Sequence, residues 1–327
     1  MTSLARPVGG PAAVLLAATV ARRYYFEGAS KSEIATELGL SRFKVARMLE
    51  RARATGLVRI ELHYEGEIDL ELSVALGTRY GLRRCLVIGS DSDSDAASPT
   101  DRDALLRANL GRAAAGLLTE IVERDDILGL AWSRTTMAVR SALGELAPCA
   151  VVQLTGAISR EDVDESSIEL VRDVARIARG PAFCFYAPMI VPDAGTARAL
   201  REQTEVASAM ARFTELTKAV VAIGAWAPGQ STVADAVSEQ ERRRDERLGV
   251  RAELGGIQLD ADGHAVATQL SERMICIGAD ALRAVPERIA IAYGTRKAAA
   301  VTAAIRGGFV STLVTHASLA RELLEPA

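Results

Sequence analysis

The sequence predicts an α/β protein in which a small N-terminal winged helix-turn-helix domain is joined to a doubly wound, Rossmann-like domain. Near the N-terminus, two short helical patterns follow each other closely. From about residue 81 onward, short apolar strands alternate with amphipathic helices, which is typical of a parallel sheet covered on both faces. We expect domains over 1–64 and 81–327, with a linker helix over 65–80 between them.

Three small or rigid residues identify the helix-turn-helix. Counting from Lys31, the fifth residue is Ala35, the ninth is Gly39 and the fifteenth is Val45. The alanine leaves room for the second helix to cross, and the glycine adopts a left-handed backbone angle at no steric cost. The valine packs into the angle between the helices. This spacing is the steric pattern of a helix-turn-helix.

The expected ends of both helices agree with this interpretation. Ser30 followed by Glu33 forms a capping box, and Ser41 caps the second helix. That helix should run to about residue 55, where Gly56 stops it. The following "LVRIELHY" (57–64) alternates in character and is expected to form the wing.

A further helix is expected ahead of the motif, over 11–28. Pro11 suits the start of a helix, and Leu15, Leu16, Thr19 and Tyr24 are expected to cover the back of the motif. The stretch could also be read as the apolar part of a signal peptide. It is amphipathic, however, and leads directly into the two helices, which favours a domain helix.

The second helix carries a cationic outer face that is suited to DNA. Residues 1–64 contain ten Lys or Arg against five Asp or Glu, whereas the remainder contains 29 against 37. Positive charge is therefore confined to one end of the chain. The alternative is a helical hairpin whose solvated face is merely basic. The residues expected to contact DNA are Ser41, Arg42, Phe43, Lys44, Arg47, Arg51 and Arg59. Arg42, Phe43 and Arg47 are expected nearest base edges, and the other cationic residues nearer phosphates.

The composition also limits where the chain can act. Four cysteines stand far apart in apolar segments, without disulfide or metal spacing, which indicates free thiols in the cytoplasm. No apolar run reaches the ~18 residues that a membrane span needs. The acidic stretch 89–101 resembles a calcium loop, but it lacks the required glycine and closing glutamate. We therefore predict no metal site and no cofactor.

The doubly wound domain is predicted from alternating elements. We expect strands at 85–89, 127–131, 150–156, 183–187, 219–225, 274–278, 289–294 and 309–315. We expect helices at 67–79, 102–123, 136–146, 165–179, 231–247, 295–306 and 316–324. Ligands of such sheets bind beyond the carboxyl ends of the strands, so the residues that follow each strand are the candidate site.

Polar residues at three strand ends predict an anion site. The strand at 127–131 leads into a helix start that combines hydroxyls, free amides and a guanidinium. A lysine in the opening turn of a helix opposes the helix dipole unless an anion lies there, although a solvated lysine is an alternative. An ordinary capped helix start also explains the first segment. The candidate ligand contacts are Trp132, Ser133, Arg134, Thr135, Thr136, Gln153, Thr155 and Lys297.

The chain resembles the SorC family of bacterial sugar-responsive transcription regulators over nearly its whole length. The likeness rests on "SKSEIATELGLSRFKVARMLERARATGLVRI", "ILGLAWSRTTMAV", "VVQLTGAIS", "LDADGHAV" and "IAYGTRKAAAVTAAIRGGFVSTLVTHASLARELL". The resemblance implies an effector domain similar to sugar-phosphate isomerases and deaminases, operator DNA as a partner, and a homodimer or homotetramer. It further implies that the 133–136 loop and Lys297 hold the phosphate of a phosphorylated sugar or polyol, and that Gln153 contacts sugar hydroxyls.

Two positions depart from the family pattern. Gly255, Gly256 and Ile257 stand where a Gly-Asp-Ile element is usual, so the acidic residue that would bind a polyol hydroxyl is expected to be absent. Tyr293 stands where a glycine is common, and an apolar part of a ligand could pack on it. The alternative function is a sugar-phosphate isomerase or deaminase that carries an autoregulatory DNA-binding domain. The candidate loops show no clearly placed carboxylate or histidine for such catalysis, which favours a regulator of a carbohydrate or polyol operon.

Overall fold

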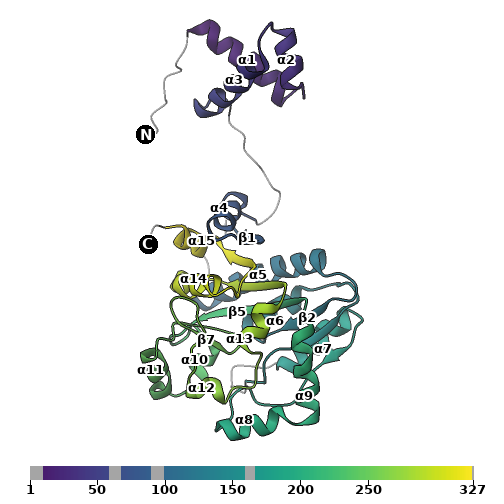
Figure 1. The fold of residues 1–327 in the computed structure, drawn as a ribbon, viewed down its shortest axis with the longest axis vertical. Coiled ribbons are helices and arrows are strands. Elements are labelled where there is room, and N and C mark those ends of the chain that lie inside the picture. The colour runs from purple at the N-terminus through teal and green to yellow at the C-terminus, as the bar shows by residue number, and fades with distance from the viewer. Residues whose placement is uncertain (1–9, 59–67, 90–98, 159–165, 326–327) are drawn as a thin grey trace. The chain divides into compact units, whose positions relative to one another are not determined.

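The structure is a computed structural model that describes residues 10–58, 68–89, 99–158 and 166–325 (Figure 1). It divides into two compact units, Met1–Tyr64 and Glu65–Ala327, and each is described here by itself. Among the described helices, none combines the length and the apolar character that crossing a bilayer requires.

Within residues 10–58, the described part of the N-terminal unit, three helices surround a small apolar core. These are α1 (Pro11–Tyr25), α2 (Lys31–Glu37) and α3 (Arg42–Ala54). The Ser30 capping box is present, with its hydroxyl accepting from Glu33 N at 3.2 Å and its own N–H donating to the Glu33 carboxylate at 2.8 Å. Gly39 has φ +64° in the turn between α2 and α3, as expected for a helix-turn-helix. The buried core is formed by Val20, Ala21, Ile34, Ala35, Val45 and Leu49.

The first helix buries a different face from the one expected. Leu15 does not cover the motif: it is 70% exposed, and the buried face of α1 is centred on Val20 and Ala21. Leu15 and Val20 are five residues apart, which places their side chains about 140° apart around the helix axis. They therefore face different sides. Thr19 is also exposed, whereas Leu16 and Tyr24 are half-buried. Most of the predicted wing (57–64), including Arg59, lies in 59–67, outside the described residues.

A mainly parallel sheet forms the centre of the C-terminal unit. Its order is β1-β9-β8-β5-β2-β3-β4, and every neighbouring pair on this path is parallel. These strands are β1 (Arg84–Ile88), β2 (Ile127–Leu130), β3 (Ala150–Gln153), β4 (Ala182–Phe183), β5 (Lys218–Ala225), β8 (Glu287–Ala292) and β9 (Thr312–His316). The short strands β6 (Ala252–Leu254) and β7 (Ile257–Leu259) form an antiparallel extension of β5.

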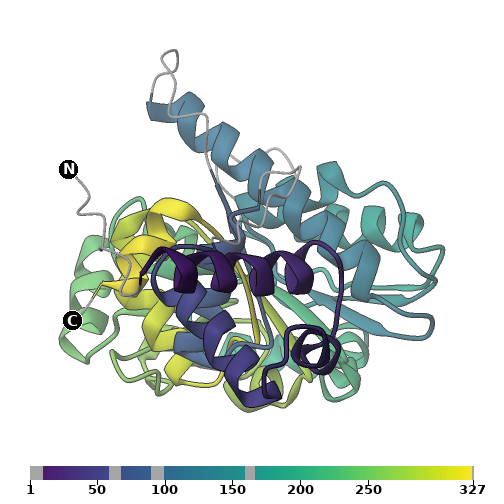
Figure 2. The same cartoon turned by 90° about the horizontal axis from the view of Figure 1, so that it is seen from above.

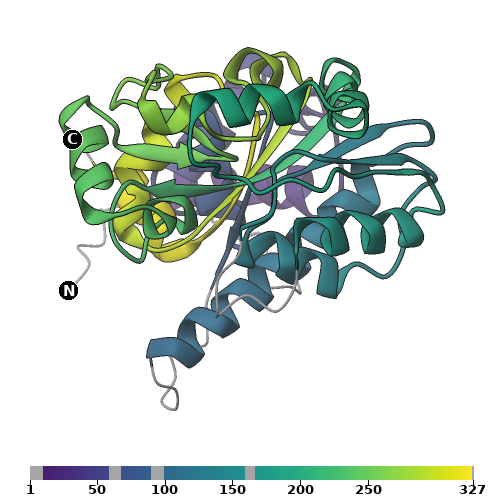
Figure 3. The ribbon, with the colours of Figure 1, turned by 90° about the horizontal axis from the view of Figure 1, so that it is seen from below.

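Helices cover both faces of the sheet, which confirms the doubly wound fold (Figure 3). One face packs against α5 (Pro99–Ile121), α6 (Arg134–Ala142) and α7 (Ser167–Ile177). The other packs against α4 (Leu70–Tyr80), α9 (Thr204–Ala211), α14 (Ala298–Arg306) and α15 (Ala317–Leu324). Successive strand residues point to opposite faces, so Val220 lies in one core and Val221 in the other. At its N-terminal end α5 projects beyond the sheet (Figures 2 and 3).

The predicted elements are mostly confirmed, with three corrections. The stretch 274–278 is not a strand and makes only isolated bridges, through Met274 and Cys276. The helix expected over 231–247 is two helices, α10 (Thr232–Ala236) and α11 (Glu239–Arg247). Besides α9, β6 and β7, the elements not predicted are α8 (Ala194–Arg201), η1 (Arg212–Glu215), α12 (Gln269–Glu272) and α13 (Ala279–Ala284).

Candidate functional site

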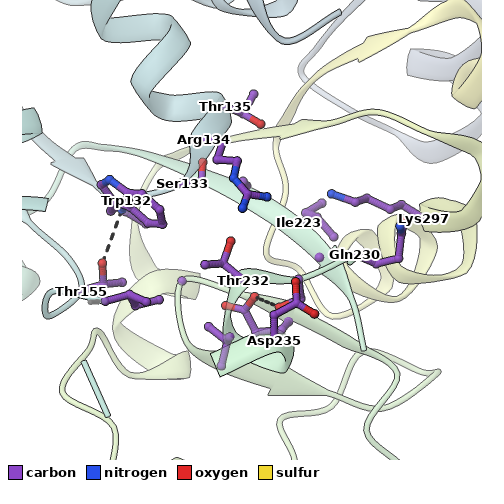
Figure 4. A pocket seen from close by; sticks show the side chains of 18 of the residues that line it. Trp132, Ser133, Arg134, Thr135, Thr155, Ile223, Gln230, Thr232, Asp235 and Lys297 are labelled. Carbon is purple, nitrogen blue, oxygen red and sulfur yellow. Dashed lines mark hydrogen bonds between the residues drawn. The ribbon is translucent and has the colours of Figure 1, made fainter. Parts of the chain in front are cut away.

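The candidate site is a pocket at the carboxyl edge of the sheet, at the point where the order in which strands are added reverses. From β2 the chain adds β3 and β4 on one side, and then returns to place β5 on the other side of β2. Loops leaving neighbouring strands at such a point separate to opposite faces, which leaves a crevice at the carboxyl ends. The segments that follow β2, β3, β5 and β8 all line the pocket (Figure 4).

The segment after β2 is fixed by a capping box. Thr136 N donates to Ser133 Oγ at 3.0 Å, and Ser133 N donates to Thr136 Oγ1 at 2.8 Å. Trp132 N lies 3.4 Å from Thr155 Oγ1, which joins this segment to the end of β3. As predicted, Trp132, Ser133, Arg134, Thr135, Thr155 and Lys297 all line one pocket.

Two cationic side chains from different elements enter the pocket. Figure 4 shows Arg134, from the start of α6, and Lys297 pointing toward each other across it. Lys297 ends the short helix η2 (Thr295–Lys297) and is the N-cap residue of α14. Burial lowers the pKa of Lys297, while the negative charges of Glu253 and Asp103 act in the opposite direction. A guanidinium and an ammonium at a helix start suit a phosphate or another anion.

Residues 255–257 carry no acidic side chain, as expected, but a carboxylate reaches the pocket from the hairpin strand β6. Glu253 is buried in the pocket wall, where Oε2 accepts from Ser231 Oγ at 2.9 Å and Oε1 accepts from Gly256 N at 2.7 Å. Burial raises the pKa of Glu253, although these hydrogen bonds and the charge of Lys297 oppose the shift. This carboxylate comes from the strand before the turn, whereas the expectation from the sequence concerned the turn itself.

Gln153 does not line the pocket, contrary to its predicted role in binding sugar hydroxyls. It is fully buried, and its side-chain amide makes two hydrogen bonds to the backbone of Phe185. Gln153 Nε2 donates to the Phe185 carbonyl at 3.2 Å, and Oε1 accepts from the Phe185 N–H at 3.1 Å. It also donates to the Thr155 carbonyl at 2.9 Å and to Ser167 Oγ at 3.2 Å. Because β4 ends at Phe183, buried backbone groups just beyond it need side-chain partners, and Gln153 supplies them.

Thr136 is likewise absent from the pocket lining. Its hydroxyl donates to the Ala131 carbonyl at 2.9 Å, and the residue is 1% exposed. Its role is to fix the start of α6, which places Ser133 and Arg134 at the pocket.

Several pocket residues were not predicted. They are Ala131, Ile158, Met189, Gly229, Gln230, Ser231, Thr232, Val233, Asp235, Glu253 and Gly255, with Ala222, Ile223 and Gly224 on β5. The polar run at 230–232 lies in the segment between β5, which ends at Ala225, and α10, so a search of the whole loop after β5 could have found it. Tyr293, noted from the sequence as a possible packing surface, also lines the pocket.

In the N-terminal unit, α3 exposes the residues predicted to contact DNA. Arg42, Phe43, Lys44 and Arg47 are all exposed, and Phe43 is 82% exposed. Arg51 is also exposed on this helix. An exposed aromatic among cationic residues is not needed for packing, so it is available to a partner.

Asp260, Asp262 and His264 bring their side chains together after β7, within the described residues. The Asp260 carboxylate accepts from Asp262 N at 3.0 Å and from His264 N at 2.8 Å. These bonds form an ordinary turn, and Asp262 and His264 are exposed, so the group does not by itself indicate a metal site.

The fold and pocket define an α/β protein with a pocket at the reversal point of its sheet. Residues 64–325 match the family described as "Putative sugar-binding domain", and the chain belongs to that family. It is 29% identical over 310 residues to the uncharacterized transcriptional regulator YjhU of Escherichia coli (strain K12), covering 92% of each chain. It is 27% identical over 316 residues to the transcriptional regulator LsrR of Enterobacter sp. (strain 638), covering 94% of this chain and 92% of that protein.

Solved structures share this fold. The full-length sorbitol operon regulator SorC from Klebsiella pneumoniae has a TM-score of 0.72 at 22% identity, covering 95% of this chain and 99% of that chain. A probable sor operon regulator from Shigella flexneri has a TM-score of 0.70 at 23% identity, covering 79% of this chain and all of that chain.

The comparisons confirm the predicted resemblance and the regulator class. The relatives named above are transcriptional regulators and carry no enzyme names. The sequence argument against catalysis concerned loops without a carboxylate, and the carboxylates that line the pocket, Glu253 and Asp235, come from other segments.

Proposed function

We propose that the protein is a cytoplasmic, DNA-binding transcription regulator of a carbohydrate or polyol operon, and that a phosphorylated sugar or polyol controls it. The observation that carries this proposal is the pocket in which Arg134 and Lys297 enter from different elements and the carboxylate of Glu253 lies in the wall. The cationic groups suit a phosphate, and carboxylates are suitable acceptors for sugar hydroxyls.

In this proposal the phosphate is held by Ser133, Arg134, Thr135 and Lys297. Glu253 and Asp235 accept hydroxyl hydrogens from the sugar or polyol, which replaces the role predicted for Gln153. Asp235 is held by the Gly229 N–H, which donates to its Oδ1 at 2.8 Å. Trp132 and Tyr293 then contact the carbon chain of the effector.

The proposed DNA contacts lie on α3 and the wing. Arg42, Phe43 and Arg47 read base edges in the major groove, and Lys44, Arg51 and Arg59 bind phosphates nearby. Ser41 fixes the start of the helix, because its hydroxyl accepts from Lys44 N at 3.2 Å. One such module buries little surface, so we propose a homodimer or homotetramer whose heads contact half-sites about 34 Å or a multiple of it apart.

A thermal-shift screen with paired ligands tests the effector half of the proposal. Each sugar or polyol is tested with and without its phosphate, and inorganic phosphate is included. We expect stabilisation by the phosphorylated member of at least one pair, because binding to the folded state alone raises the unfolding temperature. Stabilisation only by unphosphorylated compounds would contradict the proposed effector class.

Fluorescence anisotropy tests the regulator half of the proposal. The DNA is first selected from fragments of the source genome by binding to the protein. A stabilising ligand should change the affinity of the wild type for this DNA, since it can act only through unequal affinity for two conformations. Lys297→Ala should remove that response and leave the affinity without ligand unchanged. Loss of DNA binding in this variant would instead make the lysine structural, and turnover of any sugar phosphate would favour the enzyme alternative.

A further inference from the structure

Three residues from three segments form a chain that ends at the pocket. Arg107 Nη1, on α5, donates to the Tyr293 hydroxyl at 3.1 Å. The Nζ atom of Lys297 lies 5.3 Å from the centre of the Tyr293 ring. Tyr293 follows β8 immediately and lines the pocket together with Lys297. The ring therefore connects a helix on one face of the sheet to the cationic group in the site.

Some surroundings of Lys297 disfavour its charged form, and others favour it. Burial lowers its pKa, and the positive end of the α14 dipole acts in the same direction. The charges of Glu253 on β6 and Asp103 on α5 favour the ammonium, while Arg134 on α6 disfavours it. The face of an aromatic ring attracts a cation, most strongly where water is excluded. The Tyr293 ring thus adds a favourable contact where several others are unfavourable.

The same ring limits where the lysine side chain can go. Lysine has a flexible four-carbon stem, so an ammonium in an open pocket can adopt many positions. Tyr293 has few rotatable bonds, and the hydrogen bond from Arg107 fixes the outer end of its ring. A fixed ring beneath the ammonium reduces the ordering that ligand binding would otherwise require.

We propose that Tyr293 is a positioning residue that holds the Lys297 ammonium over its ring inside the pocket, and that Arg107 fixes the Tyr293 ring. This proposal rests on the proposed function only in assigning an anion to Lys297. The contact itself can be measured without any ligand.

Competitive labelling of the full chain with acetic anhydride across a pH series tests the contact directly. Mass spectrometry of the peptide that contains Lys297 gives its apparent pKa. Tyr293→Leu should move that pKa below the wild-type value, because the ammonium loses the ring. Tyr293→Phe keeps the ring but loses the hydroxyl that accepts from Arg107, so the Lys297 pKa should fall less in this variant than in Tyr293→Leu. An unchanged pKa in Tyr293→Leu would overturn the proposal.

Calorimetric titration with inorganic phosphate tests the consequence for binding. Tyr293→Leu should weaken phosphate binding roughly tenfold. As the pH is raised, the variant should lose its affinity at a lower pH than the wild type does, because its ammonium loses the proton earlier. In the Lys297→Met background the same leucine change should have almost no effect, because the group that it positions is missing. An equal loss in both backgrounds would show a merely structural role and overturn the proposal. Arg107→Met should weaken binding less than Tyr293→Leu and only while Tyr293 is present.

The two experiments separate this inference from the proposed function. If the wild type binds no phosphate while the labelling differs as expected, the positioning contact stands and the effector assignment fails. Thermal unfolding of Tyr293→Leu and Tyr293→Phe, followed by tryptophan fluorescence, verifies that both variants are folded. Both tryptophans, Trp132 and Trp226, lie in the C-terminal unit.

Discussion

Ser231 Oγ donates a hydrogen bond of 2.9 Å to Oε2 of Glu253, and this contact brings the segment after β5 together with the hairpin strand β6. The two residues stand far apart in the sequence, and both line the pocket. The serine also caps α10, because its hydroxyl accepts from Ala234 N at 3.2 Å. One hydroxyl thus fixes a helix start and orients a buried carboxylate.

Glu253→Gln should weaken the binding of phosphorylated polyols by about tenfold, because the amide presents an NH2 donor in place of one of the carboxylate acceptors. The affinity for inorganic phosphate should remain within about threefold, since the cationic groups are unchanged. Calorimetry with both ligands measures the difference. An equal loss for both would show that the carboxylate acts on the phosphate end, or on folding.

The same variant has a predicted pH dependence. The pKa of Glu253 is raised in the folded state, so the folded protein binds more protons than the unfolded chain above the ordinary pKa of 4.5. The contribution of this carboxyl to stability is therefore lost as the pH rises through its folded pKa. Glu253→Gln should gain stability relative to the wild type over that range, as measured by urea unfolding followed by tryptophan fluorescence. A difference that is independent of pH would contradict the raised pKa.

Asp126→Asn should destabilise the C-terminal unit by about 3 kcal/mol at neutral pH, since it leaves Lys218 without its carboxylate. Burial alone would raise the pKa of Asp126, but hydrogen bonds from Lys218, Thr217 and the Glu123 N–H outweigh it and hold the pKa below its usual value. This stabilisation is present above the unfolded pKa and is lost as the pH falls through the folded pKa. Urea unfolding should thus show the variant and wild type converging in acid, while constant separation would contradict the assignment.

Arg47→Ala should cost about 1 to 3 kcal/mol of operator binding and relax specificity at one base position. Arg22→Ala is the matched control, because it removes the same charge from α1, where the side chain is 78% exposed and pairs with Glu27. Anisotropy measurements with wild-type and substituted operators distinguish the two variants. Unchanged specificity in Arg47→Ala would move this residue to the phosphate contacts.

Gly39→Ala should destabilise the helix-turn-helix by about 1 to 2 kcal/mol, since the residue adopts φ +64°. An added Cβ would meet no atom within 4 Å, so the cost comes from the backbone alone. Gly10→Ala is the control, because φ there is −64° and the position is equally open. Amide exchange of α2 and α3 measures the effect, and equal exchange in both variants would argue against a strained turn.

The sequence predicted the pocket partly because its polar residues follow buried strands directly. Trp132 to Thr135 and Lys297 were found in this way, since parallel strands place their carboxyl ends at one edge. Gln153 obeys the same rule and was assigned wrongly, because the rule gives a residue's place in the chain and not the direction of its side chain. Its amide is hydrogen-bonded to the backbone of Phe185, which lies just beyond the end of the neighbouring strand β4.

The sequence by itself determined the local steric pattern of the helix-turn-helix and the alternation of strands and helices. These depend on backbone angles, caps and apolar spacing, which neighbouring residues decide. Only the tertiary structure decided that Glu253 lines the pocket, that the side chain of Gln153 does not, and that Tyr293 contacts Lys297. Each of these contacts joins residues from different elements, so it depends on strand order and packing, which no local pattern contains.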